Sequence, residues 1–205
     1  MTVWKFAVWS VAFFGVASCA TVTPTASEQV NICDIFDDRK RWYRAAAKSE
    51  DRWNVPIPLQ IAIIKQESSF DKDARPSRGQ RRFFGLARGK RPSSARGYAQ
   101  ALDSTWDEYR SSTGNQSASR SDFSDSVDFV GWYVSRSARQ TGTSTSDARS
   151  QYLAYHEGPG GFSRGTWRGN SALIATANRV AADTDRFQAQ LNGCERRLKR
   201  RGIFG

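Results

Sequence analysis

The chain has 205 residues, of which 39% are hydrophobic and 25% charged, a composition that excludes an intrinsically disordered protein and suffices for one folded domain. Its formal net charge of +11 favours anionic partners, which include nucleic acid, acidic lipid and anionic polymers. The sign of the charge does not choose among these partners, so the choice rests on the compartment.

The N-terminus has the pattern of a secretory signal peptide. Lys5 precedes an apolar run from Phe6 to Val16 that is too short to span a bilayer. The run ends in VASC, which resembles the bacterial lipobox, in which the cysteine (here Cys19) becomes the lipidated first residue. The alternative is an ordinary cleaved signal with a chance cysteine. We predict a signal peptide over residues 1–18 and a lipidated N-terminus with a polar tether over residues 19–32.

This N-terminus predicts the location of the protein. A lipid anchor at Cys19 would hold the chain at a membrane of the cell envelope. Ala20 stands where an inner-membrane retention signal would place aspartate, which favours the outer membrane facing the periplasm. An exported lipoprotein rarely meets nucleic acid, so we expect the positive charge to serve envelope polymers or lipid headgroups. The sequence leaves open whether the protein joins an envelope protein complex.

Two further cysteines, Cys33 and Cys194, lie at the two ends of the predicted domain, residues 33–194. In an oxidising compartment an even count favours a disulfide that joins the start of the domain to its end, and two free thiols are the alternative. The chain has one histidine, so we expect no His/Cys metal site, and no cofactor is predicted.

Nearly every periodic segment of the chain predicts a helix, and no alternation is long enough to build a sheet. Helices are expected over residues 37–53, from Pro58 through Glu67, and over residues 103–113, 121–141, 146–155 and 170–191. The sequence therefore predicts a single, all-α (mainly helical) domain.

Two segments depart from this pattern. The stretch from Arg75 to Arg96 is rich in glycine, proline and arginine, and it is either a loop that grips an anion or a solvated basic loop. Residues 195–205 are also basic, and we expect a frayed C-terminal tail there.

A glutamate ends the apolar helix that runs from Pro58. Glu67 lies one turn beyond Ile63, on the same side, in the last turn of the predicted helix. Apolar neighbours and the negative end of the helix dipole both disfavour its charged form, so its pKa should rise. A carboxyl that stays protonated near neutral pH is suited to general-acid catalysis, although a surface glutamate at a frayed helix end would show the same local sequence.

Three short motifs occur in order: IAIIKQESSF over residues 61–70, GYAQ over residues 97–100, and AYHEGPG over residues 154–160. In this order they resemble the signature of the SLT-type (family 1) lytic transglycosylases, whose fold is lysozyme-like. Such enzymes cleave the β-1,4 bond between N-acetylmuramic acid and N-acetylglucosamine in peptidoglycan without water, and they form a 1,6-anhydro ring.

The resemblance implies a role for each matched residue. Glu67 would be the only catalytic acid and base, and Ser68 would orient the carboxyl or a substrate group. Gln100 would line the cleft, and Tyr155 would form a hydrogen bond near the Glu67 carboxyl. The predicted substrate-binding residues are Ser68, Tyr98, Gln100, Tyr155, His156 and Phe162.

Departures from the family pattern keep two alternatives open. The second motif carries Tyr98 and Ala99, and His156 replaces the usual asparagine of the third, where we expect a structural hydrogen bond rather than proton transfer. One alternative is a lysozyme-like hydrolase with Glu157 or an aspartate as second carboxylate. The other is a non-catalytic peptidoglycan-binding lipoprotein.

The aromatic residues divide into two predicted groups. Trp106 and Trp132 recur at helical spacing, and we expect them in the core. Phe162 and Trp167 flank a glycine-rich loop and are candidates for contact with sugars, and Arg164 and Arg168 beside them would meet peptidoglycan carboxylates.

Overall fold

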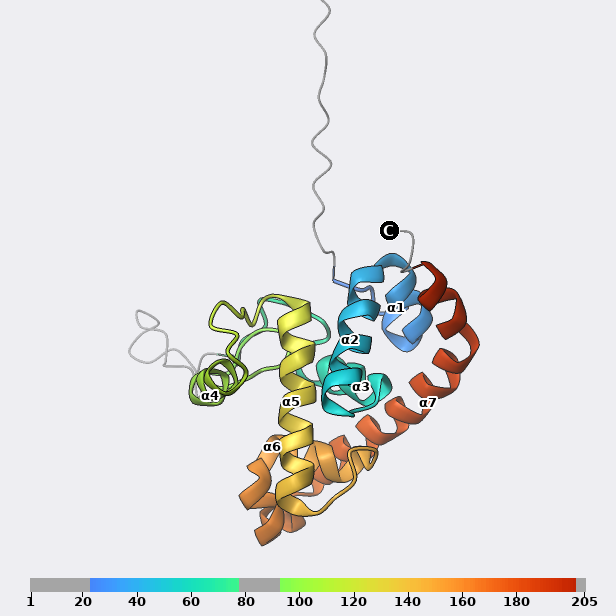
Figure 1. Ribbon diagram of the computed structural model, residues 1–205. Coiled ribbons are helices and arrows are strands. Elements are labelled where there is room, and N and C mark those ends of the chain that lie inside the picture. The colour runs from blue at the N-terminus through green and yellow to red at the C-terminus, as the bar shows by residue number, and fades with distance from the viewer. Residues whose placement is uncertain (1–22, 78–92, 202–205) are drawn as a thin grey trace, which may run out of the picture.

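The computed structural model describes residues 23–77 and 93–201 (Figure 1). The predicted signal peptide, the lipidation site at Cys19 and most of the basic stretch from Arg75 to Arg96 lie outside the described residues. Within these two ranges the secondary structure is helical, and the only β pairing is an isolated bridge between Arg96 and Ala101. The prediction of a single all-α domain is confirmed.

Seven α-helices and two short 3₁₀ helices make up the described part of the chain. None of these helices is long and apolar enough to cross a membrane. In chain order the elements are η1 (Glu28–Val30), α1 (Ile32–Asp38), α2 (Lys40–Trp53), α3 (Ile57–Ser68), α4 (Asp103–Thr113), α5 (Phe123–Thr141), α6 (Ala148–Arg164), η2 (Thr166–Gly169) and α7 (Ser171–Arg201).

Helix α3 is the centre of the fold. Every residue from Ile57 to Ile64 is buried, because α2, α5 and α7 all pack against it. Pro58 suits the first turn, where its missing N–H costs nothing, and the Glu50 carboxylate accepts the free N–H of Ile57 at 3.0 Å. The helix ends where Ser69 adopts a left-handed conformation (φ 49°).

The other helices cover this centre in pairs. Helix α2 packs on α5, α5 on α6, and α6 on α7. Figure 1 shows α7 curving along one side of the molecule and α4 lying on the other side of α5. The long helix α7 also contacts α1, so the first and last described helices lie together.

Several helix boundaries differ from the sequence prediction. The predicted helix over residues 37–53 is broken at Arg39, whose φ of −126° and ψ of 60° separate α1 from α2. Helix α6 runs beyond Tyr155, with a kink at Gly158 where φ is 73°. The left-handed region is open to glycine, and Pro159 then starts the next turn without needing an N–H partner.

The predicted frayed tail over residues 195–205 is wrong as far as Arg201, because α7 continues to that residue. Two contacts hold this last part of the helix. Leu198 is buried in the core, and the Arg197 guanidinium bonds the Asp37 carboxylate of α1.

A disulfide ties the same two helices together. Cys33 of α1 bonds Cys194 of α7 across 161 residues of chain, and their Cα atoms are 6.1 Å apart. The expected pairing of these cysteines is confirmed. Such a long loop restricts the unfolded chain strongly, so the bridge should stabilise the fold.

Replacing Cys33 and Cys194 together by alanine should lower the free energy of unfolding by about 2–5 kcal/mol. Chemical denaturation followed by circular dichroism measures the change. Reductant should lower the midpoint of the wild-type protein and leave that of the double variant unchanged. Equal midpoints for the oxidised wild type and the double variant would contradict a stabilising role.

Candidate active site

Glu67 lies in the last turn of α3, partly buried at the end of the apolar core helix. Burial raises the pKa of its carboxyl above the ordinary value. A hydrogen bond from the Tyr152 hydroxyl and the nearby charge of His156 oppose this rise, but burial is the larger effect on the pKa. The structure thus places Glu67 where a protonated carboxyl is favoured and where two groups can still stabilise its anion.

Helix α6 supplies the groups that face Glu67. Tyr152, Tyr155 and His156 are spaced three and four residues apart, so they share one face of the helix. Burial and the Glu67 charge raise the pKa of both tyrosines, which therefore stay protonated donors. Sequence reasoning missed Tyr152, although its position one turn before Tyr155 was a usable signal.

The Tyr155 hydroxyl is predicted to form a hydrogen bond near the Glu67 carboxyl, and the bond that it forms is not to that carboxyl itself. It donates instead to the carbonyl oxygen of Ala99 at 2.6 Å, and the Tyr152 hydroxyl forms the bond to Glu67. Tyr155 still lies close enough for the Glu67 charge to affect its pKa. A hydrogen bond therefore joins the third motif to the second at Ala99, and Glu67 of the first motif lies nearby.

The second motif is a tightly fixed turn. A Cβ atom on Gly97 would lie 2.1 Å from the Arg120 carbonyl oxygen, and the φ of Gly97 is 74°, so only glycine fits. The Tyr98 N–H donates to the same Arg120 oxygen at 3.2 Å. The Gln100 Nε2 donates to the carbonyls of Gly97 (2.8 Å) and Ala74 (3.0 Å), so it holds the loop rather than pointing a free donor at a substrate.

Two predicted substrate-binding residues have other contacts. Tyr98 is only 2% exposed and packs edge-on against Trp42 and Phe123, with ring centroids 5.7 and 5.5 Å away. It is a core residue, so its prediction as a sugar-binding residue is wrong. The Ser68 hydroxyl donates to the Ile64 carbonyl of its own helix at 3.2 Å, and its role toward the substrate stays a prediction.

A second carboxyl group follows His156 on α6. Glu157 accepts a hydrogen bond from the Thr166 hydroxyl, and its Oε1 lies 3.0 Å from His156 Nδ1. These two bonds lower the Glu157 pKa below its ordinary value, and the bond from Thr166 has the larger effect. Glu67 and Glu157 are therefore two carboxyls shifted in opposite directions, with His156 acting on both.

The aromatic residues lie largely as expected. Trp106 and Trp132 are core residues with 3% and 5% exposure, which confirms that prediction. Phe162 and Trp167 are partly buried and stack on each other at 6.1 Å, and the Trp167 indole N–H donates to the Phe162 carbonyl at 3.2 Å. Contact of Phe162 with a sugar stays a prediction. Among the described residues no group of three or more His, Cys, Asp or Glu side chains could hold a metal ion.

Replacing Glu67 by glutamine should stabilise the protein increasingly as the pH rises. The unfolded glutamate ionises at its ordinary pKa while the folded one resists, so the unfolded state binds fewer protons and wild-type stability falls through this range. Each unit of pKa difference is worth about 1.4 kcal/mol. Denaturation midpoints across the range from about pH 4 to 8 measure the gap between variant and wild type.

A matched control is the change Glu157→Gln, for which the sign is opposite. The folded Glu157 pKa is lowered, so wild-type stability gains as the carboxyl ionises, and the variant should lose that gain as the pH rises. Parallel pH profiles for Glu67→Gln and the wild type would rule out the raised pKa of Glu67.

Comparison with known proteins gives one family. The family model of the transglycosylase SLT domain matches residues 7–194, which include the whole predicted domain, the predicted tether and most of the predicted signal peptide. No curated protein and no solved structure matches the chain. The match spans all three motifs and the helical architecture that positions them, in agreement with the lysozyme-like fold that the resemblance implies. The chain belongs to the transglycosylase SLT domain family.

Proposed function

We propose that the protein is a lytic transglycosylase that cleaves the β-1,4 bond between N-acetylmuramic acid and N-acetylglucosamine in peptidoglycan and forms 1,6-anhydro-N-acetylmuramic acid. The observation that carries this proposal is the Glu67 carboxyl, whose pKa is raised by burial at the end of α3 while it accepts a hydrogen bond from Tyr152. Membership in the SLT family supports peptidoglycan strands as the substrate class.

The reaction needs one group to act twice. Protonated Glu67 gives its proton to the glycosidic oxygen as the bond to C1 of the muramic acid breaks. The substrate's own acetamide oxygen stabilises the positive C1. The Glu67 carboxylate then removes the proton of the C6 hydroxyl, whose oxygen bonds C1 and closes the anhydro ring. Glu67 ends protonated, so no water is consumed.

The opposing influences on Glu67 fit these two steps. Burial favours the protonated acid that starts the reaction, and the Tyr152 hydroxyl and His156 favour the carboxylate that forms next. Tyr155 has a positioning role, because its hydroxyl donates to the Ala99 carbonyl and so holds the second motif beside α6.

A lysozyme-like hydrolase is the second candidate, and Glu157 is the observation that favours it. Its lowered pKa keeps it ionised, and it shares His156 with Glu67. Both of its oxygens already accept or face a hydrogen-bond partner, Thr166 and His156, which favours a structural role. A hydrolase would add water and give reducing ends, so the products separate the two candidates.

We further propose that the protein works at the cell envelope, anchored by lipid at Cys19 and facing the periplasm from the outer membrane. The lipobox-like VASC sequence supports the anchor, and Ala20 after it supports the outer membrane. A disulfide between α1 and α7 suits an oxidising compartment.

Peptidoglycan digestion followed by mass spectrometry of the muropeptides tests the reaction. The wild type should release products one water lighter than those of a hydrolase, and Glu67→Gln should reduce the rate by at least about 10²–10⁴-fold. The matched variant Glu157→Gln should retain anhydro products. Hydrated products, or full activity of Glu67→Gln, would exclude the proposed mechanism. Intact glycan strands that still bind the protein would indicate a non-catalytic role.

Replacing Tyr152 by phenylalanine should move the alkaline limb of the pH profile of kcat/KM to higher pH. The variant loses the hydrogen bond that stabilises the Glu67 carboxylate, so the Glu67 pKa rises and the protonated acid persists to higher pH. Tyr133→Phe is the control, because Tyr133 packs against Tyr155 at 5.1 Å but has no bond to Glu67. An unshifted limb in the Tyr152 variant would argue against Glu67 as the titrating acid.

A further inference from the structure

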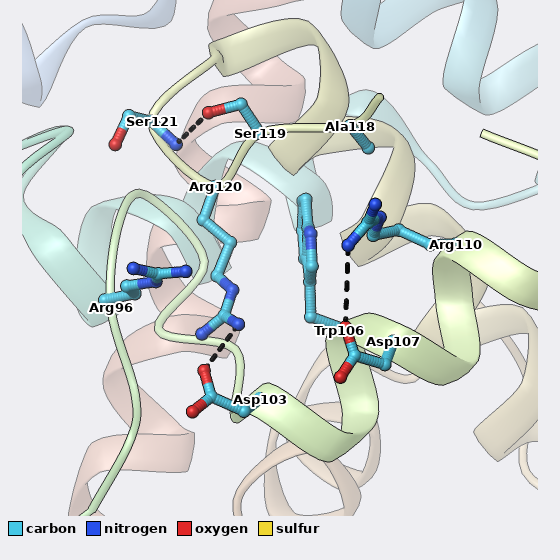
Figure 2. Close-up of a pocket in the computed structure, with 9 residues that line it drawn as sticks. All are labelled: Arg96, Asp103, Trp106, Asp107, Arg110, Ala118, Ser119, Arg120 and Ser121. Carbon is cyan, nitrogen blue, oxygen red and sulfur yellow. Dashed lines mark hydrogen bonds and ion pairs between the residues drawn. The ribbon is translucent and has the colours of Figure 1, made fainter. Parts of the chain in front are cut away.

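A charged pocket of about 510 Å³ lies beside the second motif, and Glu67 is not one of the described residues that line it (Figure 2). Its walls come from one side of α4, from the residue before the second motif and from the connection between α4 and α5. The lining residues are Arg96, Asp103, Trp106, Asp107, Arg110, Ala118, Ser119, Arg120 and Ser121.

Arg120 is the fixed inner wall of this pocket. Its side chain is 6% exposed, and it donates to the Asp103 carboxylate at 2.6 Å and to the Ala101 carbonyl at 3.0 Å. Its Nε has no hydrogen-bond partner among residues 23–77 and 93–201. A buried guanidinium that is not fully paired makes the neighbouring space favourable for an anion. It also costs stability unless something at the site compensates it.

The two other arginines can reach a ligand. Arg96 is exposed, and within the described ranges its guanidinium makes neither a hydrogen bond nor an ion pair. Arg110 makes an ion pair of 3.7 Å with Asp107, and one-third of its side chain is exposed. Figure 2 shows Arg96 pointing toward Arg120 from one side and Arg110 pointing toward Trp106 from the other.

The charge of the lining is mixed rather than uniformly positive. Three arginines stand against Asp103 and Asp107, a surplus of one positive charge, and the two carboxylates are 62% and 68% exposed. A phosphate would meet two accessible carboxylates there. A ligand that carries carboxylates and one ammonium group would instead match both signs.

The pocket is coupled by a short piece of chain to the candidate active site. Arg96 begins the segment whose Ala99 carbonyl accepts the Tyr155 hydroxyl, and Ala101 of the same segment accepts from Arg120. Three residues span at most roughly 10 Å, so a strand seated near Tyr155 can extend a substituent into the pocket.

We propose that this pocket binds the stem peptide of a peptidoglycan strand, with Arg96 holding a peptide carboxylate and Asp107 the ammonium group of the diamino acid. The proposal rests on the proposed function for its substrate class. Stem peptides carry both groups, a few bonds from the sugar that the enzyme would cleave. Trp106, at 3% exposure, forms a rigid apolar floor beneath them.

Isothermal titration of the purified full chain, in non-ionic detergent, tests this site without any turnover when the ligand is a stem tetrapeptide whose N-terminal amine is acylated, as it is in the strand. The wild type should bind the peptide, and conversion of its carboxylates to amides should weaken binding at least about tenfold, since a charge-assisted hydrogen bond is lost. Arg96→Gln should weaken binding of the free peptide by a similar factor. Arg200→Gln, which removes one exposed charge at the end of α7, should leave it unchanged.

A second variant tests the ammonium group separately. Asp107→Asn should weaken binding of the free peptide, and this loss should vanish when the side-chain amine of the diamino acid is acetylated. Equal binding of amidated and free peptide, unchanged binding by Arg96→Gln, or inorganic phosphate binding as tightly as the peptide would each overturn the proposal. Absence of anhydro products would refute the proposed function, while Arg96-dependent peptide binding would still support the pocket.

Discussion

The burial of α3 is the constraint on which the site depends. A helix with Ile57 to Ile64 all buried can sit only at the centre of the domain, with α2, α5 and α7 around it. Its last turn then brings Glu67 out of the core at a point where water is restricted and where the core helix ends. The raised pKa of the carboxyl follows from the same packing that stabilises the fold, so stability and proton chemistry cannot be tuned separately there.

A second set of contacts joins the parts of the site that are distant in sequence. The backbone carbonyl of Arg120 accepts a hydrogen bond from the Tyr98 N–H, and the Arg120 guanidinium donates one to the Ala101 carbonyl. The carbonyl of Ala99, which lies between Tyr98 and Ala101 in the chain, accepts a hydrogen bond from the Tyr155 hydroxyl. The second motif is thus fixed from both sides by hydrogen bonds rather than by its own side chains. Gln100 adds to this by bonding the loop from within. The motif is a positioned backbone, which explains why a core tyrosine is tolerated within it.

Local signals in the sequence predicted those features that depend on neighbours along the chain. The apolar run before Glu67 predicted its raised pKa, and helical spacing predicted that Trp106 and Trp132 are core residues. Features set by distant packing were missed. Tyr98 is buried because α2 and α5 bring Trp42 and Phe123 to it, and the end of α7 is helical because α1 bonds it through Asp37 and Cys33. No pattern within these segments records such partners.

Distant packing also decides which tyrosine, Tyr152 or Tyr155, forms the hydrogen bond to Glu67, and this matters for the mechanism. Both lie on one face of α6, but a rotation of the helix by part of a turn decides which hydroxyl meets the carboxyl. Packing of α6 on α5 and α7 sets that rotation and leaves Tyr155 to the Ala99 carbonyl. A group that must be first acid and then base needs a donor that stabilises its anion and does not take up the proton itself. A buried tyrosine with a raised pKa meets this need, because it donates throughout the cycle and never competes for the proton.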